Sequence, residues 1–313
     1  MASSFLVIFT LLSSSCYNSV AAYQSSYEVN RNYFGDFAYD FWYWDLAWLV
    51  WDKQCSKYNI NREVDARITG GDLAAPNMFP YQAGLLLLRA PKIYQCGGVL
   101  ISVNYVLTAA HCIYMSTRGK VFLGSTDFAN PVTSAAVFNV SASDFYVYEK
   151  YTLSGGRDDI GLIRLPTPAT LSAAVQTIPL ARRFMTQSFL EGKTVTTSGW
   201  GLTSDGSSEK MQFNLLLYYV DGPVIGMREC ACYYLPGLVR SLNHICVSGE
   251  GGRGSCDGDS GGPLTYYYNN KNYLIGLTAF GSAGGCEIGF PSVYTRITSY
   301  LDWIAERTGI KVD

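Results

Sequence analysis

The sequence has few histidines, no run of basic residues and no long apolar stretch near its start, and each absence excludes a class of protein. Only two of the 313 residues are histidine, and the nine cysteines form no paired Cys-x-x-Cys units, which argues against a zinc site. The formal net charge is −2, without a lysine- or arginine-rich run, which predicts no nucleic-acid partner. The apolar run from Phe5 to Leu12 is too short to cross a bilayer. We therefore expect no metal, no cofactor and no transmembrane segment.

The abundant residues favour a β-rich domain with many turns. Nearly half of the chain is apolar, which is enough for a sizeable core, and glycine and tyrosine are frequent. Short runs of β-branched and aromatic residues between turn residues predict strands at Gln82–Leu88, Gly98–Ile101, Tyr105–Thr108, Val121–Gly124, Gly161–Leu165, Thr194–Thr197, Tyr273–Phe280 and Ser292–Ile297. Only Ser299–Arg307 has the apolar spacing of an amphipathic helix.

The cysteines and the N-terminus together predict an extracellular protein. Without a metal site to serve, the cysteines are best explained as disulfides formed in an oxidising compartment. The apolar run Phe5–Leu12 is followed by small and polar residues up to Val20-Ala21-Ala22. This pattern is typical of a secretory signal peptide, so residues 1–22 are predicted to be removed and the protein to be secreted.

Three short motifs carry the chemistry. Ser260 lies between glycines in Gly258-Asp259-Ser260-Gly261-Gly262-Pro263, and a serine hydroxyl needs a neighbouring base to become a nucleophile. One of the two histidines lies in Leu107-Thr108-Ala109-Ala110-His111-Cys112, and an acid opens an apolar stretch in Asp158-Asp159-Ile160-Gly161-Leu162-Ile163. The order His, Asp, Ser along the chain, with these residues around each of them, resembles that of the chymotrypsin-like serine proteases.

The resemblance covers residues 68–313 and implies an all-β fold. It implies two six-stranded antiparallel β-barrels with the active site in the cleft between them, followed by a C-terminal α-helix. Protein and peptide substrates are then expected, and protein protease inhibitors are a further expected class of partner. Within the family the sequence resembles arthropod chymotrypsins and the crab enzymes called brachyurins, on the basis of the stretches from Gly251 to Ser260 and from Gly281 to Glu287.

The catalytic roles follow residue by residue from the resemblance. His111 is expected to act as the general base for Ser260, and the backbone N–H groups of Gly258 and Ser260 to bind the oxyanion. Asp159 is expected to orient His111, because it opens the apolar stretch and should point inward. Asp158 is then expected to face solvent, and His244, which lacks a comparable frame, to lie on the surface.

One position departs from the family pattern. The stretch Thr278-Ala279-Phe280-Gly281 stands where the family usually has Ser-Trp-Gly. The usual serine donates a hydrogen bond to the catalytic aspartate, and Ala279 cannot. Because a hydrogen bond to a charged group contributes roughly 1.5–3 kcal/mol, activity should be reduced but not lost. A weakly active homologue that acts as a binding protein is therefore kept as an alternative.

The residues of the expected specificity pocket are small and uncharged. Gly254 should form its base, where trypsin-like members have an aspartate, and Gly281 should leave its mouth open. Ser292 should face the floor. A lysine or arginine of the substrate would then bury an unpaired charge, which is heavily disfavoured. The prediction is cleavage after large apolar or aromatic residues, with elastase-like or broad specificity as the alternative.

The motif Ala66-Arg67-Ile68-Thr69-Gly70-Gly71 resembles the activation junction of the family. A trypsin-like protease is expected to cut after Arg67, and the new ammonium of Ile68 would pair with the carboxylate of Asp259. Two buried charges of this kind are tolerated only as a close, hydrogen-bonded pair. Residues 23–67 would thus be a pro-segment of a zymogen.

The expected pro-segment is acidic and rich in aromatic residues. It contains Phe41-Trp42-Tyr43-Trp44, Trp48 and Trp51, with interrupting aspartates that argue against a membrane span. Two interpretations stay open. The rings pack on the protease or on themselves, or the segment anchors the protein to a carbohydrate matrix or to a partner protein.

The resemblance also implies three disulfides, namely Cys96–Cys112, Cys230–Cys246 and Cys256–Cys286. Cys232 is a rival to Cys230 for the second of these. If Cys16 leaves with the signal peptide, Cys55 and the unpaired member of this couple remain. Our hypothesis is that these two link the pro-segment to the protease domain after activation.

Overall fold

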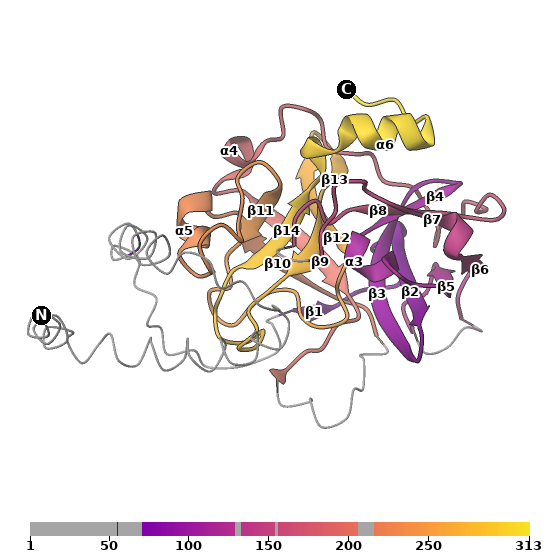
Figure 1. Ribbon diagram of the computed structural model, residues 1–313, viewed down its shortest axis with the longest axis horizontal. Helices are drawn as coiled ribbons and strands as arrows, with labels where there is room; N and C mark the ends of the chain where they lie inside the picture. Colours follow the sequence, from indigo (N-terminus) through magenta and orange to yellow (C-terminus); the bar gives the residue numbers. More distant parts are fainter. Residues whose placement is uncertain (1–54, 56–70, 129–132, 154–155, 206–215) are drawn as a thin grey trace, which may run out of the picture. The chain divides into compact units, whose positions relative to one another are not determined.

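The computed structural model describes residues 55, 71–128, 133–153, 156–205 and 216–313. They form two curled antiparallel β-sheets and a C-terminal helix, the all-β architecture that the resemblance implied (Figure 1). The predicted signal peptide and, apart from Cys55, the predicted pro-segment 23–67 lie outside the described residues, as do Arg67 and Ile68.

The first sheet has seven strands and contains most of the first half of the domain. Its strands are, in spatial order, β6 (Ala136–Ser141), β5 (Arg118–Leu123), β2 (Gln82–Arg89), β3 (Lys92–Ser102), β4 (Tyr105–Thr108), β8 (Gly161–Arg164) and β7 (Phe145–Val147). In β6 the side chains of Phe138 and Val140 are buried while their neighbours are exposed, which is the period of two expected when one face of a strand covers a core.

The second sheet also has seven strands and takes one of them from the start of the domain. Its strands are, in spatial order, β1 (Asp72–Leu73), β10 (Tyr218–Pro223), β9 (Thr194–Gly199), β12 (Pro263–Tyr268), β13 (Lys271–Phe280), β14 (Ser292–Arg296) and β11 (His244–Val247). Six strands per barrel were expected, and each sheet has seven because short edge strands such as β1 and β7 extend it.

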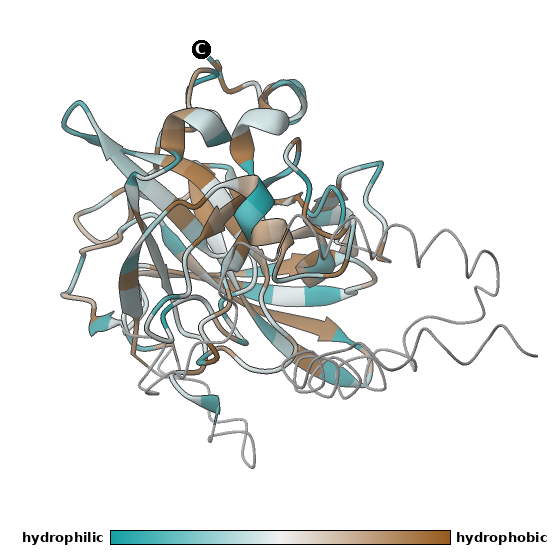
Figure 2. Cartoon of the chain, turned by 90° about the vertical axis from the view of Figure 1, so that its left-hand side faces the viewer, coloured by the Kyte–Doolittle hydropathy of each residue, from teal (hydrophilic) through white to brown (hydrophobic). Residues whose placement is uncertain are grey.

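The helices are short except for the last. The described ones are α3 (Ala110–Ile113), α4 (Gln187–Leu190), α5 (Met227–Ala231), α6 (Leu301–Thr308) and the 3-10 turns η1 (Ala142–Asp144) and η3 (Ile297–Ser299). Helix α6 buries Leu301, Trp303 and Ile304, and it ends at Gly309, whose φ of 73° is the left-handed conformation that stops helices. Apolar residues lie along the strands and on part of this helix (Figure 2). Among the described helices none is both long and apolar enough to cross a membrane.

Four disulfides join the described residues. Three of them are the pairs that the resemblance implied, Cys96–Cys112, Cys230–Cys246 and Cys256–Cys286. The fourth joins Cys55 to Cys232 across 177 residues, as the hypothesis for the remaining cysteines required. Cys55 and Cys232 are each 4% exposed, so this bond is shielded from solvent.

His244 is buried, and the prediction of a surface position was wrong. Its side chain is 1% exposed on β11, where Nδ1 accepts the backbone N–H of Arg240 at 3.0 Å. Nε2 faces the carbonyl of Gly156 at 3.4 Å, and the ring packs edge-on against Phe280. A polar residue without a local motif gives no sign of such partners, because two of them come from distant segments. Burial lowers the pKa of His244 to about 4.

We predict that His244 makes the protein less stable as the pH falls from 6.5 towards 4. In this window the unfolded chain binds a proton that the folded chain excludes, so the free energy of unfolding decreases with decreasing pH. His244→Gln keeps an acceptor for the Arg240 N–H and does not titrate, so its decline should be shallower. Denaturant unfolding at several pH values measures both slopes, and equal slopes would contradict the prediction.

Candidate active site

The pairing of β4 with β8 brings His111 and Asp159 together. These strands are antiparallel, with Thr108 opposite Gly161. The chain just after β4 and the chain just before β8 must therefore lie side by side. His111 follows β4 on the short helix α3, and Asp159 stands two residues before β8. The register of these strands therefore places both residues at the same end of the strand pair.

Two hydrogen bonds join these residues. His111 Nδ1 lies 2.6 Å from Asp159 Oδ2, and the backbone N–H of His111 donates to Asp159 Oδ1 at 2.8 Å. Asp159 is 3% exposed. Burial lowers the pKa of His111, but the charge of Asp159 and the hydrogen bond to it outweigh this and raise the pKa. Because Nδ1 faces the carboxylate, Nε2 is left free to accept a proton.

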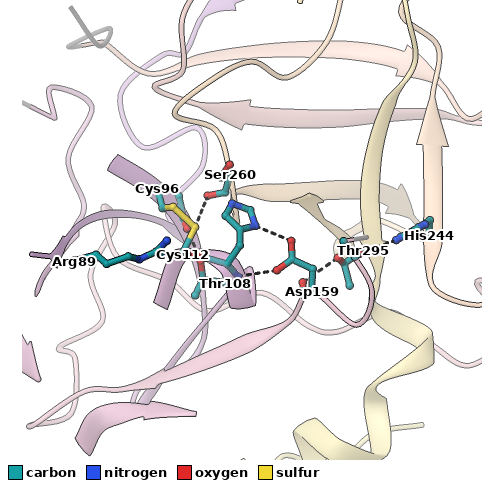
Figure 3. A network of polar contacts seen from close by, with 11 residues as sticks. Arg89, Cys96, Thr108, Cys112, Asp159, His244, Ser260 and Thr295 are labelled. Carbon is teal, nitrogen blue, oxygen red and sulfur yellow. Dashed lines mark hydrogen bonds and ion pairs between the residues drawn. A yellow bond between two sulfur atoms is a disulfide. The ribbon is translucent and has the colours of Figure 1, made fainter. Parts of the chain in front are cut away.

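Ser260 lies in the segment that precedes β12, a strand of the second sheet. Its carbonyl accepts the N–H of Gly97 at 2.7 Å and lies 3.5 Å from the Sγ of Cys112, the neighbour of His111 in sequence. Figure 3 shows Ser260 and Asp159 in the same network of contacts. The Ser260 hydroxyl makes no hydrogen bond to a described residue, and catalytic hydrogen bonds are often formed only with substrate in place.

Glycines let the Ser260 segment approach the first sheet. A Cβ on Gly261 would lie 2.2 Å from Thr108 Oγ1, and a Cβ on Gly97 would lie 2.8 Å from the Cα of Gly262. Both distances are shorter than real contacts allow, so side chains at these positions would push Ser260 away from His111.

The backbone around Ser260 leaves two N–H groups available. Gly258 has φ of 101°, a conformation that side chains with a Cβ rarely adopt. Neither the Gly258 N–H nor the Ser260 N–H donates to an acceptor among the described residues, whereas the N–H of Asp259 donates to Cys256.

The expected pocket residues Gly254 and Ser292 lie together, and Gly281 borders open space. Ser292 is 4% exposed, and its Oγ accepts the N–H of Ser255 at 3.1 Å. A Cβ on Gly254 would lie 2.4 Å from this oxygen, so nothing larger than glycine fits there. A Cβ on Gly281 would have no atom within 4 Å.

A pair of acids that the motifs did not reveal connects two loops near the pocket residues. The carboxylate of Asp205 accepts the N–H groups of Cys286 and Glu287 at 2.8 and 3.1 Å, and Glu287 Oε2 accepts the N–H of Asp205 at 2.8 Å. The two acids are 82 residues apart in the chain, so no local pattern could have indicated this contact.

Asp259 is a buried carboxylate beside a small cavity. It accepts the N–H groups of Gly201 and Cys256 at 2.7 and 2.9 Å, and burial raises its pKa to about 6. It forms no ion pair with a described residue. The cavity has a volume of about 30 Å³ and is lined by Gly71, the first residue described after the predicted activation junction, and by Gly201 and Asp259.

Asp158 does not simply face solvent, which corrects the expectation from the sequence. It is half-buried, and its Oδ1 accepts the Asn243 side-chain N–H and the Tyr300 hydroxyl, both at 2.9 Å. Its φ of 54° lies in the left-handed region, which aspartate tolerates better than most residues. Asn243 and Tyr300 follow Asp158 by 85 and 142 residues, so no local sequence pattern could have indicated these contacts.

Two groups of possible metal ligands occur among the described residues, and neither is suited to a metal. One is Cys96, His111 and Cys112, and the other is Asp205, Cys256 and Cys286. In each group both cysteines belong to a disulfide, so they offer no thiolate.

The chain is similar to known proteins over most of its length. A sequence profile of the trypsin family matches residues 68–304. Brachyurin from Leptuca pugilator is 41% identical over 243 residues, which are 78% of this chain and 99% of the relative. A chymotrypsin from Phaedon cochleariae is 34% identical over 244 residues, 77% of this chain and 83% of the relative. A solved structure of HL collagenase superposes with a TM-score of 0.68 at 34% identity, over 77% of this chain and 99% of that one. The chain belongs to the trypsin family and is a chymotrypsin-like serine endopeptidase.

Proposed function

We propose that the protein is a secreted zymogen that, once cut after Arg67, hydrolyses peptide bonds after large apolar or aromatic residues. His111, Asp159 and Ser260 are its catalytic residues. The observation that carries the proposal is the 2.6 Å contact between His111 Nδ1 and Asp159 Oδ2. It lies at the end of strands β4 and β8, and the Ser260 segment lies against Cys112, the neighbour of His111. Four disulfides support an oxidising, extracellular location.

In the first half of the reaction Ser260 becomes acylated. Its Oγ attacks the carbonyl carbon of the substrate while His111 Nε2 takes the hydroxyl proton. The imidazolium is stabilised by the carboxylate of Asp159, which stays ionised. The oxyanion of the tetrahedral intermediate accepts hydrogen bonds from the N–H groups of Gly258 and Ser260, which have no other described acceptor.

Acylation is completed when His111 gives its proton to the leaving amine, which departs as the tetrahedral intermediate collapses to an ester on Ser260. In the second half of the reaction the acyl group is released. A water molecule then attacks the ester carbonyl and gives a proton to His111, and the same two N–H groups bind the second oxyanion. Proton return from His111 to Ser260 Oγ frees the carboxylic acid product.

We predict that Asp159→Asn lowers kcat by about 10⁴-fold, because a neutral amide cannot hold His111 in the right tautomer or stabilise its cation. Steady-state kinetics on a peptide substrate measures the effect. Asp302→Asn, on an exposed position of α6, is the matched control and should leave kcat unchanged. A loss below tenfold for Asp159→Asn, with correct folding, would refute the assigned role.

The pocket residues support large uncharged substrate side chains. Gly254 and Ser292 put no charge at the base, and an unpaired lysine or arginine there would be costly. Gly281 leaves the mouth open, because a Cβ there would meet nothing within 4 Å. This combination favours phenylalanine, tyrosine, tryptophan, leucine or methionine at the cleaved bond over the smaller residues that an elastase-like pocket takes.

We predict that Gly281→Val lowers kcat/KM for a phenylalanine substrate by at least about tenfold while an alanine substrate is cut as before. The valine would narrow the mouth of the pocket without a clash that disturbs folding. Titration with a small serine-directed phosphonylating reagent checks that the catalytic residues are intact. Wild-type enzyme that prefers alanine to phenylalanine would show an elastase-like specificity instead.

Asp259 and the disulfide of Cys55 support activation by a cut that leaves the pro-segment attached. The raised pKa of Asp259, which burial causes, indicates a carboxylate that lacks a cation, and the ammonium of Ile68 would supply one. The cavity beside Asp259 is lined by Gly71, so the new terminus is close to it in sequence. Cys55 precedes the cut and is bonded to Cys232 in the protease domain.

We predict that cutting after Arg67 with a trypsin-like protease generates activity and yields two chains that separate only on reduction. Gel electrophoresis with and without reductant measures this. Cys232→Ser should release the pro-segment without reductant, since the disulfide that links it to the described part of the protease domain is then lost. Release from the wild-type protein under non-reducing conditions would disprove the tether, and activity in the uncut protein would disprove the zymogen.

A further inference from the structure

We propose that Thr295 is a positioning residue for Asp159 and acts with Asn243 and Tyr300, which hold Asp158. We call these three residues the backbone clamp, because one bonds the Asp159 carbonyl and two bond the Asp158 side chain, which together hold the segment that carries the catalytic carboxylate. The inference rests on the catalytic role proposed for Asp159.

By the resemblance, Ala279 stands where the family has a serine that donates to the catalytic aspartate. Ala279 is buried and has no side-chain donor, so it cannot hydrogen-bond the carboxylate of Asp159. Among the described residues the carboxylate accepts hydrogen bonds from His111 alone, at its Nδ1 and its backbone N–H. Because these bonds go only to the residue that Asp159 orients, something else must hold Asp159 in place relative to the rest of the fold.

Thr295 holds Asp159 in place through a hydrogen bond to its backbone carbonyl. Its Oγ1 donates to the carbonyl of Asp159 at 2.9 Å, and the residue is 1% exposed. Figure 3 shows Thr295 beside Asp159, on the side away from Ser260. Thr295 lies on β14, between its partners His244 on β11 and Leu277 on β13. A residue paired on both sides within a sheet has little freedom to move, so its hydroxyl is a fixed point for the Asp159 carbonyl.

Asn243 and Tyr300 fix the preceding residue. Both donate to Asp158 Oδ1 at 2.9 Å, and Asn243 also donates to the Tyr300 hydroxyl at 2.7 Å. Asp158 has φ of 54°, a sparsely populated conformation that persists where the surroundings enforce it. The turn that aims Asp159 inward is thus held at two consecutive residues by the second sheet and the start of α6.

The test is Thr295→Val, which removes the hydroxyl and keeps the shape. Loss of one hydrogen bond to the Asp159 carbonyl should lower kcat about tenfold with KM unchanged. Because Asp159 raises the pKa of His111, a less well-placed carboxylate should shift the acidic limb of the kcat/KM profile to lower pH. Thr295→Ser keeps the hydroxyl and should stay close to wild type in both measurements.

A matched control separates positioning from stability. Thr265 is also a buried threonine of the second sheet, and its hydroxyl donates to the Thr196 carbonyl at 3.2 Å. Thr265→Val should lower the free energy of unfolding to a similar extent but leave kcat and the pH profile unchanged. Tyr300→Phe, which keeps the ring against Tyr148, gives a second test should Thr295→Val fail to fold, and it should change kcat in the same direction.

Ala279→Ser tests the link to the missing donor. A serine there should raise kcat, and in its background Thr295→Val should cost less than in the wild type, because the carboxylate then has a second anchor. The proposal is overturned if Thr295→Val matches Thr265→Val in kcat and pH profile, or if Tyr300→Phe is the only foldable variant and has no effect on either. Asp159→Asn separates failure of this proposal from failure of the proposed function. A small loss of kcat in that variant would refute the catalytic role of Asp159 itself.

Discussion

The hydrogen bond between His111 and Asp159 depends on the register of β4 against β8, and much of the fold preserves that register. A slip by one residue would turn Asp159 to the other face of the chain, since side chains alternate along a strand. Ser260 reaches the same place from the segment before β12 of the second sheet, and its carbonyl accepts the N–H of Gly97 of β3. The candidate site is thus assembled at the ends of strands, and backbone pairing sets the positions of His111 and Asp159.

The sequence contained enough information for the fold class and for the three catalytic candidates, because each has a local frame that distant contacts do not alter. It was insufficient for Asp158 and His244, which were expected to face solvent. Their burial is caused by partners such as Asn243 and Gly156, and polarity alone indicates exposure when partners are unknown. Strand β6 was missed because the exposed Val137 stands beside the buried Phe138, so the sequence does not alternate as the burial does.

Under our proposal, Thr295 and the serine that the family usually has at the position of Ala279 would hold the catalytic aspartate in different ways. A side-chain donor acts on the carboxylate itself, whereas Thr295 acts on the carbonyl of the same residue from the same sheet. The two arrangements differ electrostatically. A donor on the carboxylate stabilises its charge and reduces its basicity, while a donor on the carbonyl fixes position and leaves the charge fully available to His111.

If the chain is cut after Arg67 as proposed, the disulfide of Cys55 has a consequence for where the cut enzyme is found. A covalent link keeps two chains at a constant stoichiometry after the peptide between them is cut. Any surface that binds the aromatic stretch around Trp42 would then hold the catalytic domain within a linker's length, at an effective concentration in the millimolar range. Local concentration, rather than affinity of the active site, would decide which proteins such an enzyme meets first.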